Sequence, residues 1–209
     1  MHISWNFLGI FVWAILVIYV FFIIHNIRQR HLKMIIQKRR KFDAKTTIID
    51  VIEILIFILA CSYMSVITFF DNPNFSNQQI LTNKFEYQPL VLSTGATKSH
   101  YVTVTCRHNR KMKQSYRFFS EDQRITVKSN YASIAEGVDP FPVEAQIIPY
   151  NKKDLRAADD HYQKAYVAIY TATYKKNWQN GLGLHAGHVF IKYYLIRVPD
   201  RSFIKIIEK

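Results

Sequence analysis

Two long apolar stretches dominate the N-terminal third of the chain. The first, Trp5–Ile24, contains Asn6 as its one strongly polar side chain, and its 20 residues would rise about 30 Å as an α-helix. That rise matches the hydrocarbon thickness of a bilayer. The second stretch is Thr46–Phe70. We therefore predict that residues 1–70 form a hairpin of two transmembrane helices, over residues 5–24 and 46–70.

A short basic loop, residues 25–45, separates the two stretches. Its positive charges lie close to both apolar ends: Arg28, Arg30, Lys33, Lys38, Arg39, Arg40, Lys41 and Lys45. With Asp43 as the one acid, the loop has a net charge of +7. Short loops rich in Lys and Arg stay on the cytoplasmic side, so we predict a cytoplasmic loop with the N-terminus and the C-terminal domain outside. The basic residues either serve topology alone or also contact anionic lipid headgroups.

Two acidic residues interrupt the second stretch near its cytoplasmic end. Asp50 and Glu53 are three positions apart and so share one face of a helix. An acid at the centre of a bilayer costs roughly 2.5–3.5 kcal/mol on insertion scales, so a place at the interface beside a positive charge is favoured. In an antiparallel hairpin the acids would face His25, Asn26 and Arg28 at the end of the first helix. We expect Asp50 and Glu53 to form their charge pair with Arg28. A proton or ion relay is the alternative.

The pattern changes at Asp71. The following residues are polar and include the helix breaker Pro73, so residues 71–88 are predicted to be a linker. Apolar and polar positions then alternate through residues 89–209, as they do in strands. The predicted strands are Pro89–Ser93, Ser99–His108, Met112–Ser120, Arg124–Lys128, Glu144–Ile148, Tyr162–Trp178, Val189–Val198 and Phe203–Ile207.

Two periodicities compete within Lys152–Tyr174. Its apolar positions fit a helical stripe at first and a strand later, so we predict one or two helical turns over Lys153–Asp160 before the strand that begins at Tyr162. The C-terminal part is thus expected to be a mostly antiparallel β domain with a little helix, of the α+β class. In the predicted topology this domain is extracytoplasmic.

The net charge of +13 does not require a nucleic-acid partner. The membrane-flanking loop accounts for more than half of it, and residues 71–209 contain 20 basic and 12 acidic residues. Cys61 lies in an apolar stretch and Cys106 in a polar domain, so a disulfide between them is not expected. An anionic lipid surface, a cell-wall polymer or a partner membrane protein suits this charge pattern.

Candidate catalytic chemistry is sparse. His185 and His188 form an H-x-x-H pattern in a Gly-rich loop, but zinc needs three or four ligands and no further ligand motif accompanies them. We therefore predict no metal and no cofactor, and keep the two histidines as weak site candidates. Asp159, Asp160 and His161 are expected to face solvent. Walker, G-x-S-x-G and dinucleotide-binding motifs are absent from the sequence.

Several segments carry a resemblance to a family. These are WNFLGIFVW at the start, the basic loop, IIDVIEI at the entry to the second apolar stretch, and NGLGLHAG and YYLIRVP near the end. In their order they resemble an uncharacterised family of small membrane proteins from lactobacilli and related lactic acid bacteria. The resemblance implies the plasma membrane of a Gram-positive bacterium and implies no mechanism.

Two classes of function follow. The first is a membrane-anchored extracytoplasmic module that takes part in binding or assembly at the bacterial cell envelope. The second is an envelope enzyme with a site in the C-terminal domain made of a histidine and a carboxylate. The lack of a catalytic signature favours the first class.

Overall fold

The computed structural model describes residues 4–38, 43–94, 98–106, 114–121, 123–137, 142 and 145–208. By its internal contacts the chain divides into two compact units. The helical unit contains Met1–Pro73 and Tyr174–His188, and the sheet unit contains Asn74–Thr173 and Val189–Lys209. The helical unit therefore includes a segment that interrupts the sheet unit along the sequence.

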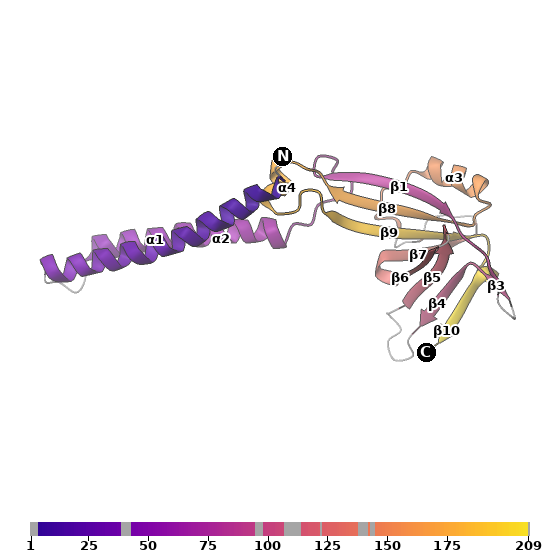
Figure 1. Cartoon of the computed structure of the whole chain (residues 1–209), viewed down its shortest axis with the longest axis horizontal. Coiled ribbons are helices and arrows are strands. Elements are labelled where there is room, and N and C mark those ends of the chain that lie inside the picture. The colour runs from indigo at the N-terminus through magenta and orange to yellow at the C-terminus, as the bar shows by residue number, and fades with distance from the viewer. Residues whose placement is uncertain are drawn as a thin grey trace. The chain divides into compact units, whose positions relative to one another are not determined.

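Two long helices make up most of the helical unit: α1, Asn6–Lys38, and α2, Ala44–Phe69. They lie side by side (Figure 1). α1 continues through much of the predicted loop 25–45, so the prediction of a loop was wrong for residues 25–38. The physical reason is that no Gly or Pro interrupts this stretch, and its Arg, Lys, Gln, Leu and Met residues are good helix formers.

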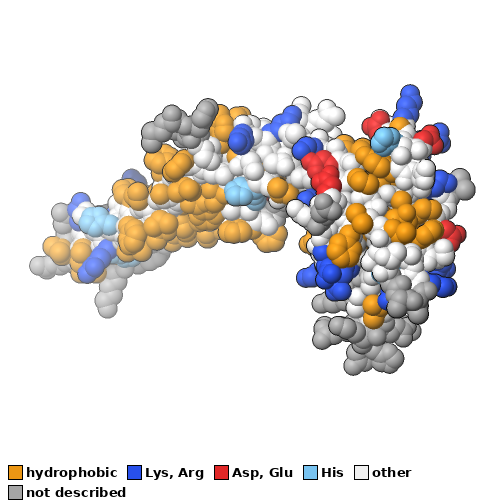
Figure 2. All heavy atoms as spheres, turned by 45° about the vertical axis from the view of Figure 1, so that its right-hand side comes forward, with side chains coloured by type: hydrophobic (Ala, Val, Ile, Leu, Met, Phe, Trp, Pro, Cys, Tyr) orange, Lys and Arg blue, Asp and Glu red, His pale blue; other side chains and the backbone are white. Residues whose placement is uncertain are grey.

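Both helices present apolar side chains outward along most of their length. By length and composition Asn6–Ile36 and Ala44–Phe69 could each cross a membrane. Only 17% and 6% of their most apolar windows are buried. The exposed side chains form a long apolar band in the space-filling view (Figure 2). A helix of a water-soluble domain buries its apolar face in a core, so these surfaces call for an apolar environment.

The sheet unit contains two four-stranded sheets packed face to face. Their strand orders are β1-β8-β9-β7 and β10-β4-β5-β6. Val102 and Phe118 of the second sheet share one core with Val167, Ile169 and Ile196 of the first. The bounds are β1 Leu81–Pro89, β4 Val102–Cys106, β5 Gln114–Ser120, β6 Gln123–Lys128, β7 Ala132–Glu136, β8 Tyr166–Tyr174, β9 Val189–Val198 and β10 Ile204–Glu208.

The strand pairing is mixed. The meander β4-β5-β6 and the pair β8–β9 are antiparallel, whereas β7 runs parallel to β9 and β10 parallel to β4. A short antiparallel pair, β2 (Ser93–Thr94) with β3 (Ser99–His100), precedes β4. Together with the helices described next, this is the α+β class that the sequence predicts.

The central strand β8 is covered on both faces. One face points into the core between the sheets. On the other face Tyr166 lies beneath helix α3, Lys152–His161, and Tyr170 packs against Tyr150. The Tyr166 hydroxyl donates a hydrogen bond to the carbonyl of Leu155 in α3, at 3.1 Å. Burial raises the pKa of the Tyr166 hydroxyl. Because both faces are largely buried, seven of the nine positions of β8 are apolar or aromatic, the exceptions being Thr171 and Thr173, and this explains the competing periodicities in the sequence.

A buried ion pair joins α3 to β9. The Arg197 guanidinium is fully buried and donates to both carboxylate oxygens of Asp159, at 2.9 and 3.1 Å, and to the carbonyl of Gly137 at 2.8 Å. Removing either partner of such a bidentate pair would leave the other charge buried without a counter-charge, which destabilises the fold. The prediction that Asp159 faces solvent was wrong, whereas Asp160 and His161 are exposed as expected.

Several predicted elements are confirmed. Val189–Val198 coincides with β9, Arg124–Lys128 falls within β6, and the predicted helical turns over Lys153–Asp160 fall within α3. The predicted strand that ran to Trp178 ends earlier, at Tyr174.

Other predictions were wrong. Residues 81–88 of the predicted linker belong to β1, an edge strand that contains several polar residues, and β7 was not predicted. Of the predicted strand Glu144–Ile148, Glu144 lies outside the described residues, and the rest forms a turn in which the Ile148 amide donates to the Ala145 carbonyl.

Candidate functional site

The segment Tyr174–His188, here called the docked segment, lies against one end of the helical hairpin. This end, the open end, consists of the start of α1 and the last turn of α2. Within the docked segment Asn177 caps the short helix α4, Trp178–Leu182, by accepting a hydrogen bond from the Asn180 amide at 2.9 Å. At its base, Tyr174 exchanges backbone hydrogen bonds with Gly187 and His188. The segment is therefore a closed, internally bonded loop.

Asn6 binds the docked segment through both ends of its side-chain amide. Its nitrogen donates to the carbonyl of Ala186 at 3.2 Å, and its oxygen accepts from the Ala186 amide at 3.0 Å. This pairing satisfies a backbone donor and a backbone acceptor at once. It also explains the one strongly polar residue in the first apolar stretch.

Glycines allow the backbones of the hairpin and the docked segment to approach closely. A Cβ atom added at Gly9 would come within 2.6 Å of the Leu182 carbonyl oxygen, and one at Gly181 would overlap Trp5. One at Gly183 would lie 2.9 Å from the carbonyl oxygen of Ile67 in α2. Small residues serve the same purpose where membrane helices pack against each other.

His185 connects the docked segment to the end of α2. Its Nε2 atom lies 3.3 Å from the carbonyl oxygen of Ile67, one of the last carbonyls of the helix, which have no intrahelical partner. Its ring stacks on Tyr174 with centroids 4.9 Å apart. Burial, followed by the charge and hydrogen bond of Asp71, raises the pKa of Tyr174 to about 12. The His185 imidazole thus serves as a helix cap.

His188, the other weak site candidate, has an exposed side chain and contributes its backbone to the base of the docked segment. The two histidines of the H-x-x-H pattern therefore have separate surroundings. Among the residues that the structure describes, no group of three or more His, Cys, Asp or Glu side chains could hold a metal ion.

A second polar cluster joins α1 to α2 away from the open end. Arg30 donates to Asp50 at 2.7 Å and also to Glu53. Asp50 is further approached by His31 at 3.2 Å, and the Asn26 amide donates to Glu53 at 3.0 Å. The side chain of Asp50 is buried. We call these five residues the charge cluster.

The charge cluster uses Arg30 where the sequence analysis named Arg28. Helix geometry gives the reason: Asn26 and Arg30 are four residues apart and share a face, whereas Arg28 is two residues from each and points to the opposite side. Arg28 is exposed, as are Lys33 and Lys45. Lys38 ends α1, and Arg39, Arg40 and Lys41 lie outside the described residues.

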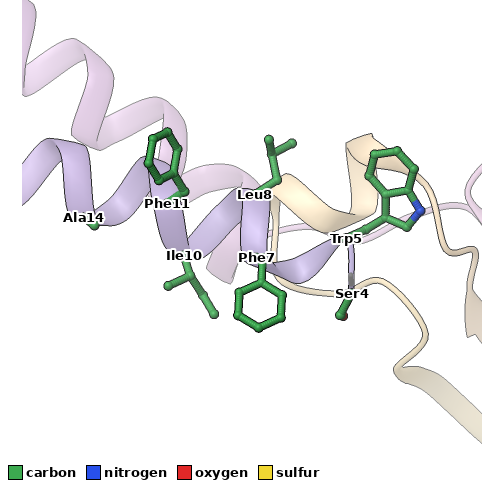
Figure 3. A pocket seen from close by; sticks show the side chains of 7 residues that line it. All are labelled: Ser4, Trp5, Phe7, Leu8, Ile10, Phe11 and Ala14. Carbon is green, nitrogen blue, oxygen red and sulfur yellow. The ribbon is translucent and has the colours of Figure 1, made fainter. Parts of the chain in front are cut away.

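The start of α1 also borders an apolar hollow of about 710 Å³. Figure 3 shows Phe7 and Ile10 along one flank of the helix. The complete lining is Ser4, Trp5, Phe7, Leu8, Ile10, Phe11 and Ala14. All of these residues come from one helix and the turn before it, so the hollow is an open apolar surface.

The structure thus shows the architecture of this class of protein: a unit of two long apolar helices with a docked loop, and an α+β unit with two four-stranded sheets. A protein-family model matches residues 4–205, and the chain belongs to that uncharacterised family. This agrees with the resemblance to an uncharacterised family of small lactobacillal proteins. Comparisons with curated proteins and with solved structures gave no match.

From the sequence we expected a Gly-rich loop around His185 and His188, and the contact of the docked segment with the hairpin was not predicted. Two signals pointed to it. Asn6 is isolated among apolar residues, and NGLGLHAG combines three glycines and an alanine in eight positions. The sequence does not indicate that these two segments contact each other, because 180 residues separate Asn6 from Ala186.

We expect Arg30→Gln to destabilise the hairpin, because Asp50 and Glu53 would both lose the guanidinium that contacts them. The expected loss is about 2–3 kcal/mol, less than the 3–5 kcal/mol of a fully buried pair because the Arg30 side chain is 20% exposed. Thermal unfolding in detergent and abundance in membranes would measure it.

Arg28→Gln is the matched control and should change both quantities little. Equal effects of Arg28→Gln and Arg30→Gln would contradict the assigned pairing. The double variant Asp50→Asn with Glu53→Gln tests the alternative of a proton or ion relay. If this variant reaches normal abundance but loses an ion flux that the unmodified chain supports, the relay is favoured.

We expect Asn6→Leu to loosen the docked segment while leaving α1 helical. Two hydrogen bonds to Ala186 are lost, and at about 0.5–1.5 kcal/mol each this predicts roughly 5- to 160-fold faster amide exchange at Ala186. Hydrogen–deuterium exchange of the docked segment measures the change. Phe7→Leu, at a side chain that is 61% exposed, is the control. Unchanged exchange at Ala186 in the Asn6 variant would refute the role of this amide.

Proposed function

We propose that this chain is a membrane-anchored module that takes part in binding or assembly at the outer face of the plasma membrane. The observation that carries the proposal is the exposed apolar surface of α1 and α2. Ile18, Phe21 and Phe69, for example, are each about two-thirds or more exposed. Burial in hydrocarbon removes this surface from water at about 25 cal/mol per Å².

The distribution of charge supports the orientation of the proposed anchor. The basic residues Arg28, Arg30, Lys33 and Lys45, whose side chains the structure describes, lie in the part of the hairpin away from the open end. The positive-inside rule assigns this part to the cytoplasmic side. The open end and the sheet unit then belong to the outer side, in a multi-pass protein of a Gram-positive cell membrane.

The length of α1 fits the same arrangement. From Asn6 to Arg30 the helix rises about 36 Å, slightly more than the hydrocarbon thickness of about 30 Å. The charge cluster then lies near the cytoplasmic interface, where paired charges are tolerated. The apolar hollow at the start of α1 suits lipid acyl chains.

The surroundings of His185 favour binding or assembly over catalysis. An enzyme of the alternative class needs an imidazole free to exchange a proton with a substrate. The His185 ring instead stacks on Tyr174 and its Nε2 atom faces a helix carbonyl. The histidine of this motif is therefore assigned to holding the docked segment on the hairpin.

The proposal predicts that the purified full chain, in mild detergent, is retained by isolated cell envelopes in low salt. Residues 71–209, which include most of the sheet unit, contain 20 basic and 12 acidic residues. Salt screens the attraction of this positive charge to anionic polymers, so retention should fall at 1 M salt, where the Debye length is about 3 Å. Sedimentation of the chain with envelope fragments at both salt concentrations measures this. Absence of retention at low salt, or retention that salt does not change, would contradict electrostatic binding.

A further inference from the structure

A polar hollow of about 300 Å³ lies in the sheet unit. Its lining is Lys98, Ser99, His100, Ser202, Ile204 and Lys205. Five of these six side chains are polar or positively charged, and none is acidic. A volume of this size is at the lower end of ligand pockets and suits one small group.

The pairing of two parallel strands brings these residues together. β4 and β10 run side by side with Val102 opposite Ile204, so the residues that precede each strand also meet. The Tyr101 amide donates to the Phe203 carbonyl at 2.9 Å, and the rings of these two residues lie 5.2 Å apart. The hollow therefore lies between Lys98 and strand β3, which precede β4, and Ser202 with the start of β10.

Neighbouring groups leave the positive charge of the hollow in place. Asp200 is the acid closest to the lining in sequence, and its carboxylate accepts a hydrogen bond from the Ser202 amide at 2.8 Å. The backbone and side chain of Ser202 hold the pKa of this carboxyl below its usual value. Asp200 thus caps the short helix that begins at Arg201, and it does not line the hollow.

We propose that this hollow binds a phosphate group, either free or in a phosphodiester. Two ammonium groups, an imidazole and two hydroxyls provide more donors than the two oxygens of a carboxylate can accept, whereas phosphate offers up to four oxygens. The inference rests on the proposed binding function and names its ligand class. It does not depend on the direction in which the helices cross the membrane.

The test is a titration of the full chain in detergent and phosphate-free buffer. The probes are inorganic phosphate, the water-soluble phosphodiester glycerophosphoglycerol, and acetate as the carboxylate control. Calorimetry should show saturable binding of phosphate or the phosphodiester and at least tenfold weaker binding of acetate. Lack of saturation, or acetate that binds equally well, overturns the proposal.

Two double variants separate the hollow from the general charge of the chain. Lys98→Gln with Lys205→Gln should weaken phosphate binding at least tenfold. Lys128→Gln with Lys153→Gln removes the same charge from exposed positions outside the lining and should change binding less than twofold. Equal weakening in both double variants overturns the proposal. The single variant Lys98→Gln, at an exposed loop position, should give an intermediate affinity even if the double variant folds poorly.

The source of the phosphate is distinguished in lipid nanodiscs. If the group belongs to a lipid headgroup, the water-soluble phosphodiester should bind more weakly to the chain in phospholipid nanodiscs than in phosphate-free detergent, because the headgroup phosphates then compete for the hollow. Equal binding in nanodiscs and in detergent assigns the site to a soluble or polymeric phosphate. Saturable binding together with absence of envelope retention would show that the hollow is an anion site although the proposed envelope function is wrong.

Discussion

The apolar surface of α1 and α2 is the constraint on which the rest of the structure depends. In hydrocarbon every backbone donor and acceptor needs a partner within the protein, and a helix provides this for all but its ends. Polar side chains are therefore tolerated near the ends of the hairpin. The charge cluster around Arg30 and the contacts of Asn6 and His185 occupy these two regions.

The two polar regions have different consequences. In the charge cluster, one guanidinium contacts acids on two successive turns of α2 and so opposes sliding of the helices along each other. At the open end, the docked segment supplies backbone partners to Asn6 and caps a carbonyl of α2. Because the docked segment continues into β8 and β9, the chain passes between the two units three times, after residues 73, 173 and 188. The hairpin is thus linked to the sheet unit by more than the predicted linker.

Local patterns allowed much of the fold to be predicted. Each element that was predicted in this way has a local pattern of apolar residues that reflects which of its own positions avoid water. This holds for the two apolar stretches, for the meander from β4 to β6 and for strand β9. Edge strand β1 was missed because exposed Lys84 and half-buried Glu86 interrupt its apolar pattern, and β7 because its small residues resemble a loop. A sequence pattern reports which residues are apolar and does not report whether neighbouring strands run parallel.

The sites were harder to predict because each depends on contacts between distant residues. The acids Asp50 and Glu53 were visible as an anomaly, but choosing Arg30 over Arg28 required the rotation of α1 to be known to within half a turn. The ion pair of Arg197 with Asp159 required the placement of α3 on the sheet. The hollow beside Lys98 and Lys205 required the parallel pairing of β4 with β10.

Labelling of single cysteines in intact cells tests the proposed orientation most directly. In a chain with Cys61→Ala and Cys106→Ala, cysteine is introduced at Lys153 in α3 or at Lys45 at the start of α2, both exposed positions. A membrane-impermeant maleimide should label the Lys153→Cys chain in intact cells and the Lys45→Cys chain only after permeabilisation. Labelling of Lys45→Cys in intact cells, with protection of Lys153→Cys, would contradict a sheet unit on the outer side of the membrane.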